Sequence, residues 1–305
     1  MSRALKGKAI EAFGGAAVVE VDSTAGTAPI LTAERVIQEV HRRLTRFDPE
    51  SELSQLNEDR RERVPASPVM LRFVTEARAA AELTGGLVDP TVLSLVEAAG
   101  YRESFADGTP ETAVQSSEPP PEWKPGLWES IEVDPEEGEV VRQPGIRLDA
   151  GGIGKGLAAD LVAEALQGES VPFFTVNCMG DLRIGGTLGE PRQVQIASPL
   201  NSDETIAEIE ITDGAVATSG TTKRSWSDQD ERLLHHLIDP TTGQPATTGV
   251  IQVTALAPTA TEAEARAKAA LLSGPEGASD WLPHGGVIVS EDGNVEVLGD
   301  DVEAV

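Results

Sequence analysis

Short strand patterns separated by turn residues fill the second half of the chain, and they constrain the fold more than any other feature of the sequence. These patterns lie at residues 172–186, 192–198, 204–212, 214–220, 233–246, 250–258 and 285–299. Helical patterns precede them or stand between them at residues 32–47, 67–86, 88–101, 153–167 and 261–273. Strands in series with helices between them predict an α+β or mixed fold.

Several local patterns make sharper predictions. Ser67 and Pro68 predict the start of the helix over residues 67–86, and Asp89 is placed to cap a helix that begins at Pro90. Residues 130–142 alternate between polar and apolar on each side of a turn, which predicts a hairpin. Residues 145–152 predict a strand that ends in glycines, and residues 8–22 predict one strand interrupted by glycine.

One internal stretch differs in character from the rest of the chain. Residues 103–126 are acidic, rich in Pro and Ser, and contain a PPP run. We interpret them as a surface loop rather than a domain boundary, because the secondary-structure pattern resumes after them without a new start. A chain of 305 residues forms one large domain or two smaller ones, and we predict a single domain over residues 1–305 that contains this loop.

The charge of the chain excludes some classes of partner. The net charge is −27, and such a field repels nucleic acid and anionic membranes. The acidity is typical of a solvated surface, as in salt-adapted proteins, and it leaves room for an anionic small ligand at a locally positive site. No apolar stretch is long enough for membrane insertion, and the first residues lack a secretion-signal pattern, so we expect a cytoplasmic protein. The single cysteine, Cys178, lies in an apolar run and is expected to be a buried small hydrophobe.

The stretch RLDAGGIGKGLAAD, residues 147–160, has the composition of a phosphate-binding glycine loop. It is not a P-loop, because Gly156 rather than Ser or Thr follows the lysine, and Leu157 replaces the last glycine of a dinucleotide fingerprint. Glycines that let the backbone turn into a helix with free N–H groups indicate an anion site, to which Lys155 would add an ammonium. The alternative is a solvent-exposed lysine beside Asp149, with the glycines needed only for packing.

Two adjacent histidines are the other candidates for chemistry. His235 and His236 lie in LLHHLIDPTTG, where a strand would point them to opposite faces, so at most one faces a given site. One of them could act as a general base on a hydroxyl, and the alternative is a buried, hydrogen-bonded histidine. The sequence contains no His-x-x-x-His, cysteine cluster or Gly-x-Ser-x-Gly, so a zinc site or serine hydrolase has no support.

Seven motifs follow one another along the chain: SELSQLN, LVDPTVLSLVEAAGY, LDAGGIGKGLAADLV, VNCMGDLRIGG, VATSGTT, HLIDPTTGQP and VTALAPTATEAEARAKAALLSG. In this order they resemble the motifs of the ApbE-type FAD:protein FMN transferases. The resemblance covers most of the chain, from about residue 12 through Gly274. It implies a T-fold-like α+β core of mixed or antiparallel strands with packed helices. It also implies FAD and Mg²⁺ as cofactors, and transfer of FMN through its phosphate to a Thr or Ser hydroxyl of an acceptor protein, with release of AMP.

The resemblance also implies roles for particular residues. His236 matches the histidine of the family's H-x-I-D-P turn, a general base, and Lys155 would hold charge during transfer. The implied FAD contacts are Phe13, Phe47, Leu87, Val88, Asp89, Asp149, Lys155 and Ile238. The carbonyl of Gly152 and the carboxylate of Glu264 match metal-ligand positions.

The implied metal site departs from the family pattern. The family has a threonine four residues after the acidic ligand, whereas this chain has Lys268 there and Ala267, which cannot coordinate, before it. One interpretation is an i,i+4 pair of Glu264 and Lys268 on the helix surface. The other places the Lys268 ammonium where Mg²⁺ would lie, facing the pyrophosphate of FAD.

We therefore predict an FAD-binding FMN transferase, with two alternatives. The first is a non-catalytic flavin-binding protein that has lost the metal site. The second is an FAD pyrophosphatase, in which water replaces the protein acceptor.

Overall fold

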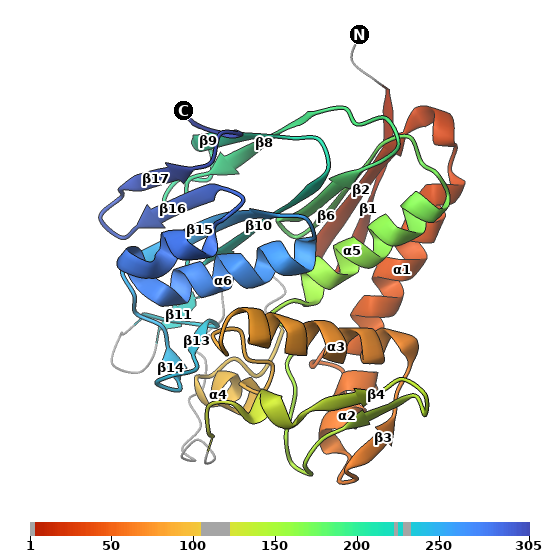
Figure 1. Ribbon diagram of the computed structural model, residues 1–305, viewed down its shortest axis with the longest axis vertical. Coiled ribbons are helices and arrows are strands. Elements are labelled where there is room, and N and C mark those ends of the chain that lie inside the picture. Colours follow the sequence, from red (N-terminus) through yellow and green to blue (C-terminus); the bar gives the residue numbers. More distant parts are fainter. Residues whose placement is uncertain (1–3, 105–122, 223–224, 228–232) are drawn as a thin grey trace. The chain divides into compact units, whose positions relative to one another are not determined.

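The computed structural model describes residues 4–104, 123–222, 225–227 and 233–305 (Figure 1). The chain divides into two compact units. Unit 1 comprises residues 1–41, 155–220 and 249–305, and unit 2 comprises residues 42–154 and 221–248. Neither unit is one continuous stretch, so we keep the single domain over residues 1–305 as a proposal. Most of the predicted acidic loop, residues 105–122, lies outside the described residues.

Unit 1 is built on an eight-stranded sheet. In sheet order its strands are β1 (Leu5–Ala12), β2 (Gly15–Asp22), β6 (Phe174–Cys178), β7 (Asp181–Gly185), β10 (Gly214–Gly220), β15 (Val250–Ala257), β16 (Gly286–Ser290) and β17 (Val295–Leu298). Every strand pair within the described residues is antiparallel. This confirms the α+β class and the antiparallel strands expected from the sequence.

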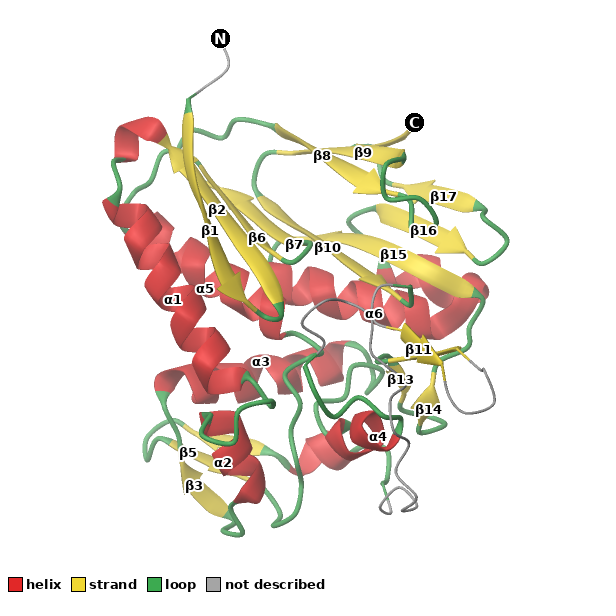
Figure 2. Cartoon of the chain, turned by 180° about the vertical axis from the view of Figure 1, so that it is seen from behind, coloured by secondary structure: helices red, strands yellow, loops and turns green. Residues whose placement is uncertain are grey.

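The two faces of this sheet are covered differently (Figure 2). Helices α1 (Ala28–Leu44), α5 (Gly154–Gly168) and α6 (Ala260–Gly277) lie on one face. A three-stranded sheet lies on the other, in the order β18 (Val302–Ala304), β9 (Thr205–Ile211) and β8 (Arg192–Ala197). The core between the two sheets is mainly aliphatic; its buried members include Ile184, Ile196, Ile209, Val216, Leu256, Val287 and Val289. None of the helices in the described part of the chain combines the length and the apolarity needed to cross a bilayer.

Residues 8–22 form a hairpin and not the single interrupted strand predicted. Ala12 pairs with Gly15, so Phe13 and Gly14 make a two-residue turn. Their φ angles are 58° and 81°, as in a type I′ turn, which matches the twist of the flanking strands. Asn-Gly is the usual sequence signal for this turn. This chain has Phe-Gly instead, so the sequence did not predict the turn.

Unit 2 combines helices with small sheets. Its helices are α2 (Glu52–Glu58), α3 (Pro68–Leu83) and α4 (Leu93–Ala98), and its strands are β3 (Arg63–Pro65), β4 (Glu132–Asp134), β5 (Glu139–Val141), β11 (Ser225–Ser227), β12 (Leu233–His235), β13 (Ile238–Asp239) and β14 (Gln244–Pro245). The Ser67 side chain caps α3 by accepting the N–H of Met70 at 3.2 Å, and Pro68 is the first helical residue, as predicted. Strands β4 and β5 confirm the predicted hairpin.

Two local predictions in unit 2 are wrong. The Asp89 carboxylate accepts the N–H and the hydroxyl of Thr91, at 2.7 and 2.6 Å, and α4 starts only at Leu93. Aspartate at a turn competes in this way with capping of a helix. Residues 145–152 form turns and irregular backbone instead of a strand, because the Leu148 N–H donates to the Asn57 side chain at 2.7 Å and not to a neighbouring strand.

Helices α5 and α6 approach each other closely at their first turns. The Asp160 carboxylate of α5 accepts the N–H groups of Ala260 and Thr261, each at 2.8 Å, at the start of α6. A side chain on Gly156 would overlap the carbonyl oxygen of Ala260. Glycine is therefore required at residue 156 by the approach of a neighbouring backbone.

Gly156→Ala should lower the free energy of unfolding by about 1–3 kcal/mol, because the added methyl group overpacks the α5–α6 contact. Gly168→Ala is the matched control in the same helix, since nothing lies within 4 Å of a Cβ at that residue. It should raise stability by up to about 1 kcal/mol. Urea denaturation of both variants checks this, and equal effects of the two substitutions would contradict it.

Candidate functional site

Four charged side chains of unit 1 meet in a buried group, which we call the lysine–carboxylate cluster. The Lys155 ammonium donates to the Asp181 carboxylate and, at 2.9 Å, to Oε1 of Glu264. The Lys268 ammonium donates to the same Oε1 at 2.8 Å, and the N–H of Gly156 donates to Oε2 at 2.9 Å. The side chains of Asp181 and Glu264 are 0% and 1% exposed. Two positive and two negative charges therefore balance inside unit 1.

Three elements bring these side chains together. Lys155 lies in the first turn of α5, Asp181 is the first residue of β7, and Glu264 and Lys268 are one turn apart on α6. The capping of α6 by Asp160 fixes the register of α6 against α5. The cluster is thus a consequence of the same contact that requires glycine at residue 156.

Burial and pairing oppose each other in the pKa values of the cluster. Burial lowers the pKa of Lys155, but the charges of Asp181 and Glu264 overcome this and raise it. Burial raises the pKa of Glu264, yet the two lysines lower it to about 2. For Asp181 burial dominates and raises the pKa to about 6. Glu264 therefore carries the negative charge around which the cluster is organised.

The pairing and burial of the two lysines exclude the interpretations that place them on the surface. Lys155 is not the solvent-exposed neighbour of Asp149, because its ammonium binds Asp181 and Glu264. The Glu264–Lys268 pair forms as predicted, but it is not a surface pair, because its side chains are only 1% and 9% exposed.

The residues around Glu264 do not fit a magnesium ion. Mg²⁺ takes about six oxygen ligands in octahedral geometry, whereas both oxygens of Glu264 accept hydrogen bonds from Lys155, Lys268 and Gly156. The described residues contain no group of three or more His, Cys, Asp or Glu side chains that could hold a metal ion. Gly152 belongs to unit 2, and its role as a ligand stays a prediction.

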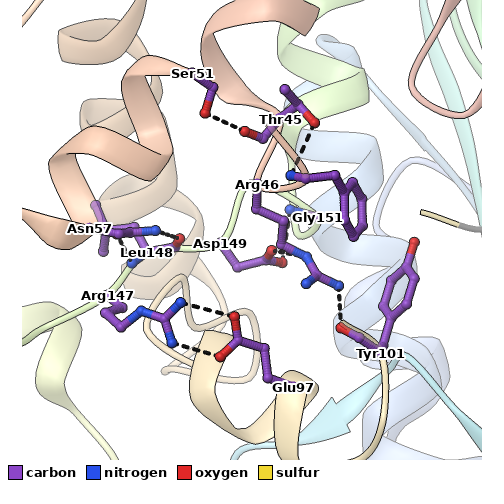
Figure 3. A network of polar contacts seen from close by, with 11 residues as sticks. Thr45, Arg46, Ser51, Asn57, Glu97, Tyr101, Arg147, Leu148, Asp149 and Gly151 are labelled. Carbon is purple, nitrogen blue, oxygen red and sulfur yellow. Dashed lines mark hydrogen bonds and ion pairs between the residues drawn. The ribbon is translucent and has the colours of Figure 1, made fainter. Parts of the chain in front are cut away.

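A second polar group lies in unit 2, around Arg46 (Figure 3). The Arg46 guanidinium lies over the rings of Phe47 and Tyr101, 4.3 and 4.4 Å from their centroids. Its Nε lies 3.3 Å from Oδ1 of Asp149, and its Nη2 donates to the carbonyl oxygen of Tyr101 at 2.7 Å. Oδ2 of Asp149 accepts the N–H of Gly151 at 3.0 Å. Two residues that were predicted to contact FAD, Phe47 and Asp149, therefore contact the same arginine in unit 2.

The segment that contains Leu87, Val88 and Asp89 lies beside the glycine segment in unit 2. The N–H of Asp149 donates to the carbonyl of Pro90 at 2.8 Å, and a Cβ built on Gly152 would lie 3.2 Å from Val88 Cγ1. Leu87 and Val88 are themselves held by Thr84, whose carbonyl accepts the Leu87 N–H at 3.2 Å and whose hydroxyl accepts the Val88 N–H at 3.0 Å. Asp89 is buried, and burial raises its pKa.

The two histidines of unit 2 have different surroundings. His235 is buried, and its Nε2 lies 2.8 Å from the carbonyl oxygen of Ala246, so it is the structural, hydrogen-bonded histidine; burial lowers its pKa. His236 is half-buried and meets the Tyr101 ring edge to face, with centroids 6.3 Å apart. Ile238 is buried in an apolar cluster that includes Tyr101 and Trp226. Contact of Ile238 with flavin stays a prediction.

Phe13 lies in unit 1, at the turn between β1 and β2. Its N–H donates to Nδ1 of His41 at 3.3 Å, and the two rings meet edge to face at 5.4 Å. Burial lowers the pKa of His41. The contact explains how a phenylalanine is held at a positive φ angle.

Sequence reasoning missed three residues of these groups: Arg46, Tyr101 and Asp181. Asp181 lies in the motif VNCMGDLRIGG, directly after a glycine. An acidic residue in this apolar motif is a signal that could have predicted a buried carboxylate with a cationic partner. Arg46 and Tyr101 are 55 residues apart, and no spacing rule connects them.

Comparisons with known proteins agree on one family. The chain matches the sequence model of the ApbE family over residues 16–289. It is 29% identical over 294 residues to the FAD:protein FMN transferase of Klebsiella pneumoniae (strain 342), covering 93% of this chain and 82% of that protein. It is 30% identical over 236 residues to the Escherichia coli (strain K12) protein of the same name, covering 74% of this chain and 65% of that protein.

Solved structures agree with the fold. The crystal structure of the ApbE protein of Thermotoga maritima matches with a TM-score of 0.79 at 27% identity, covering 97% of both chains. The flavin transferase ApbE from Vibrio cholerae matches with a TM-score of 0.74, covering 98% of both chains. At 22% identity, the second match supports the fold alone.

Lys155→Met should lower the free energy of unfolding by about 3–5 kcal/mol, because it leaves the buried carboxylates with one ammonium instead of two. Lys8→Met is the matched control: it breaks an exposed ion pair with Glu34 at 2.6 Å and should cost less than about 1 kcal/mol. Urea denaturation compares the two variants. A similar small loss for both would show that the lysine–carboxylate cluster does not depend on Lys155.

Proposed function

The chain belongs to the ApbE family, and from this we propose that it is an FAD:protein FMN transferase. It binds FAD and joins FMN, through its phosphate, to a Thr or Ser hydroxyl of an acceptor protein, releasing AMP. The curated relatives from Klebsiella pneumoniae and Escherichia coli bear this name. The observation that carries the proposal is the pair of buried ammonium groups at Lys155 and Lys268, in a chain that matches the family over residues 16–289.

The proposed reaction balances as a single displacement at phosphorus. The acceptor hydroxyl oxygen attacks the phosphorus on the FMN side of FAD, the pyrophosphate P–O bond breaks, and AMP leaves with the bonding electron pair. His236 takes the hydroxyl proton, as a general base does. Positioning and charge neutralisation provide most of the catalysis in such a step.

The roles proposed for the other residues follow their surroundings. As the family resemblance implies, we propose FAD contacts for Phe13, Phe47, Leu87, Val88, Asp89, Asp149, Lys155 and Ile238. The exposed ring of Phe47 supports a stacking role, because aromatic faces bind flat rings. We also propose that the protein acts in the cytoplasm, as its sequence predicts.

For the charge on the pyrophosphate, we propose that the Lys268 ammonium replaces the Mg²⁺ of the family. This is supported by the hydrogen bonds that both lysines donate to the one oxygen Oε1 of Glu264. An ammonium neutralises charge but is a weaker Lewis acid than a divalent cation. The same observation favours a second candidate function, a flavin-binding protein without transfer activity.

His236→Gln should lower the rate of FMN transfer by at least about 100-fold, because the general base is lost, while FAD still binds. His235→Gln is the matched control; it removes the hydrogen bond to Ala246 and should reduce stability but not the transfer rate of the folded protein. AMP release, measured by chromatography with FAD and an acceptor domain, distinguishes them. An unchanged rate in the His236 variant would rule out His236 as the base.

Lys268→Thr should make FAD binding depend on Mg²⁺, with an affinity about tenfold higher with Mg²⁺ than with a chelator. The substitution removes one of the two ammonium groups on Oε1 of Glu264 and restores the threonine of the family pattern as a metal ligand. The unsubstituted protein should bind FAD equally in both conditions. Flavin fluorescence titrations test both. Dependence on Mg²⁺ in the unsubstituted protein would show that Lys268 does not take the place of the metal.

A further inference from the structure

We propose that Arg46 is a positioning residue for flavin binding. Its guanidinium holds the Phe47 ring and the Asp149 carboxylate in place for the flavin. The inference rests on the proposed function, which assigns both of these residues to FAD. The family resemblance implies no role for Arg46. The role follows from its contacts with Phe47 and Asp149 in unit 2.

The guanidinium of Arg46 makes contacts of two kinds at once. Its flat group lies over the Phe47 and Tyr101 rings, whose own centroids are 5.6 Å apart. At its edge it reaches Oδ1 of Asp149 and the carbonyl of Tyr101. A planar guanidinium can stack on aromatic rings with its face and donate hydrogen bonds from its edge at the same time. The ammonium of lysine has no flat face to stack.

The exposures show what these contacts hold. The side chain of Arg46 is 8% exposed and that of Asp149 14%, whereas Phe47 is 37% exposed. Phe47 lies after the end of α1 at Leu44, outside any helix or strand. A ring in such a place keeps its orientation only if side chains around it fix it, and a ring fixed in advance loses less entropy when a ligand stacks on it.

The contacts continue from Arg46 towards His236. Tyr101, which accepts a hydrogen bond from Arg46, also meets the rings of Trp226 and His236, at centroid distances of 5.9 and 6.3 Å. Arg46 is therefore joined directly to two predicted FAD contacts and, through Tyr101, to the proposed base.

A second arginine of unit 2 provides a control for a purely structural role. Arg147 donates to both oxygens of Glu97, at 2.6 and 2.9 Å, and Figure 3 draws this pair apart from the contacts of Arg46 with Asp149 and Tyr101. Arg147 thus forms a two-fold hydrogen-bonded ion pair, but its partner, Glu97, has no role in the proposed function.

The test compares Arg46→Lys with Arg147→Lys. Both variants keep the positive charge and replace a forked donor by a single ammonium. We expect Arg46→Lys to raise the Kd for FAD at least about tenfold and to reduce the quenching of flavin fluorescence, because the ring of Phe47 is no longer held. Arg147→Lys should leave the Kd within about twofold. Urea denaturation measures the loss of stability of each variant, so affinity and folding are read separately. If Arg46→Lys does not fold, Arg46→Gln takes its place in the same comparison.

Two results would overturn the proposal. One is an Arg46 variant that is folded and binds FAD as tightly as the unsubstituted protein. The other is an Arg147 variant that loses affinity as much as the Arg46 variant, which would make the effect one of general stability. If the unsubstituted protein itself does not bind FAD, the proposed function fails, and this result is distinct because it appears before any substitution is made.

Discussion

The carboxylate of Glu264 is the constraint around which unit 1 is organised. A charged carboxylate that is 1% exposed is tolerated only if ammonium or N–H groups surround it. Lys155 from α5, Lys268 from α6 and the N–H of Gly156 supply these groups. Helix α5 must therefore approach α6 at its first turn, and this fixes glycine at residue 156 and places Asp160 to cap α6.

The same constraint gives this chain its difference from the family pattern. The Lys268 ammonium donates to Glu264, so two ammonium groups already face the two carboxylates of the cluster before any ligand arrives. A divalent cation would instead have to be bound from solution, and the occupancy of its site would vary with its concentration. In the proposed function, the ammonium neutralises charge with less Lewis acidity than a divalent cation has.

Patterns that are local in sequence were predictable, and contacts between distant segments were not. Ser67 and Pro68 predicted the start of α3, and residues 130–142 predicted a hairpin, because capping and alternation act over a few residues. The turn at Phe13 was missed because its sequence lacks the usual Asn-Gly signal. The i,i+4 spacing predicted the Glu264–Lys268 pair, but its burial depends on α5, whose Lys155 lies 109 residues before Glu264, and on β7.

The scarcity of aromatic residues makes their placement informative. Only 4% of the chain is aromatic, and Tyr101 is the sole tyrosine. The core between the sheets of unit 1 is mainly aliphatic, so that core needs few rings. In unit 2, by contrast, Tyr101 contacts the rings of Phe47, Trp226 and His236, with Arg46 over two of them. Phe173 and Phe174 are buried at the large sheet of unit 1, whereas the rings around Tyr101 contact one another, and Phe47 among them stays 37% exposed. An exposed ring that neighbouring side chains hold in place supports the proposal of a flat ring as the ligand of unit 2.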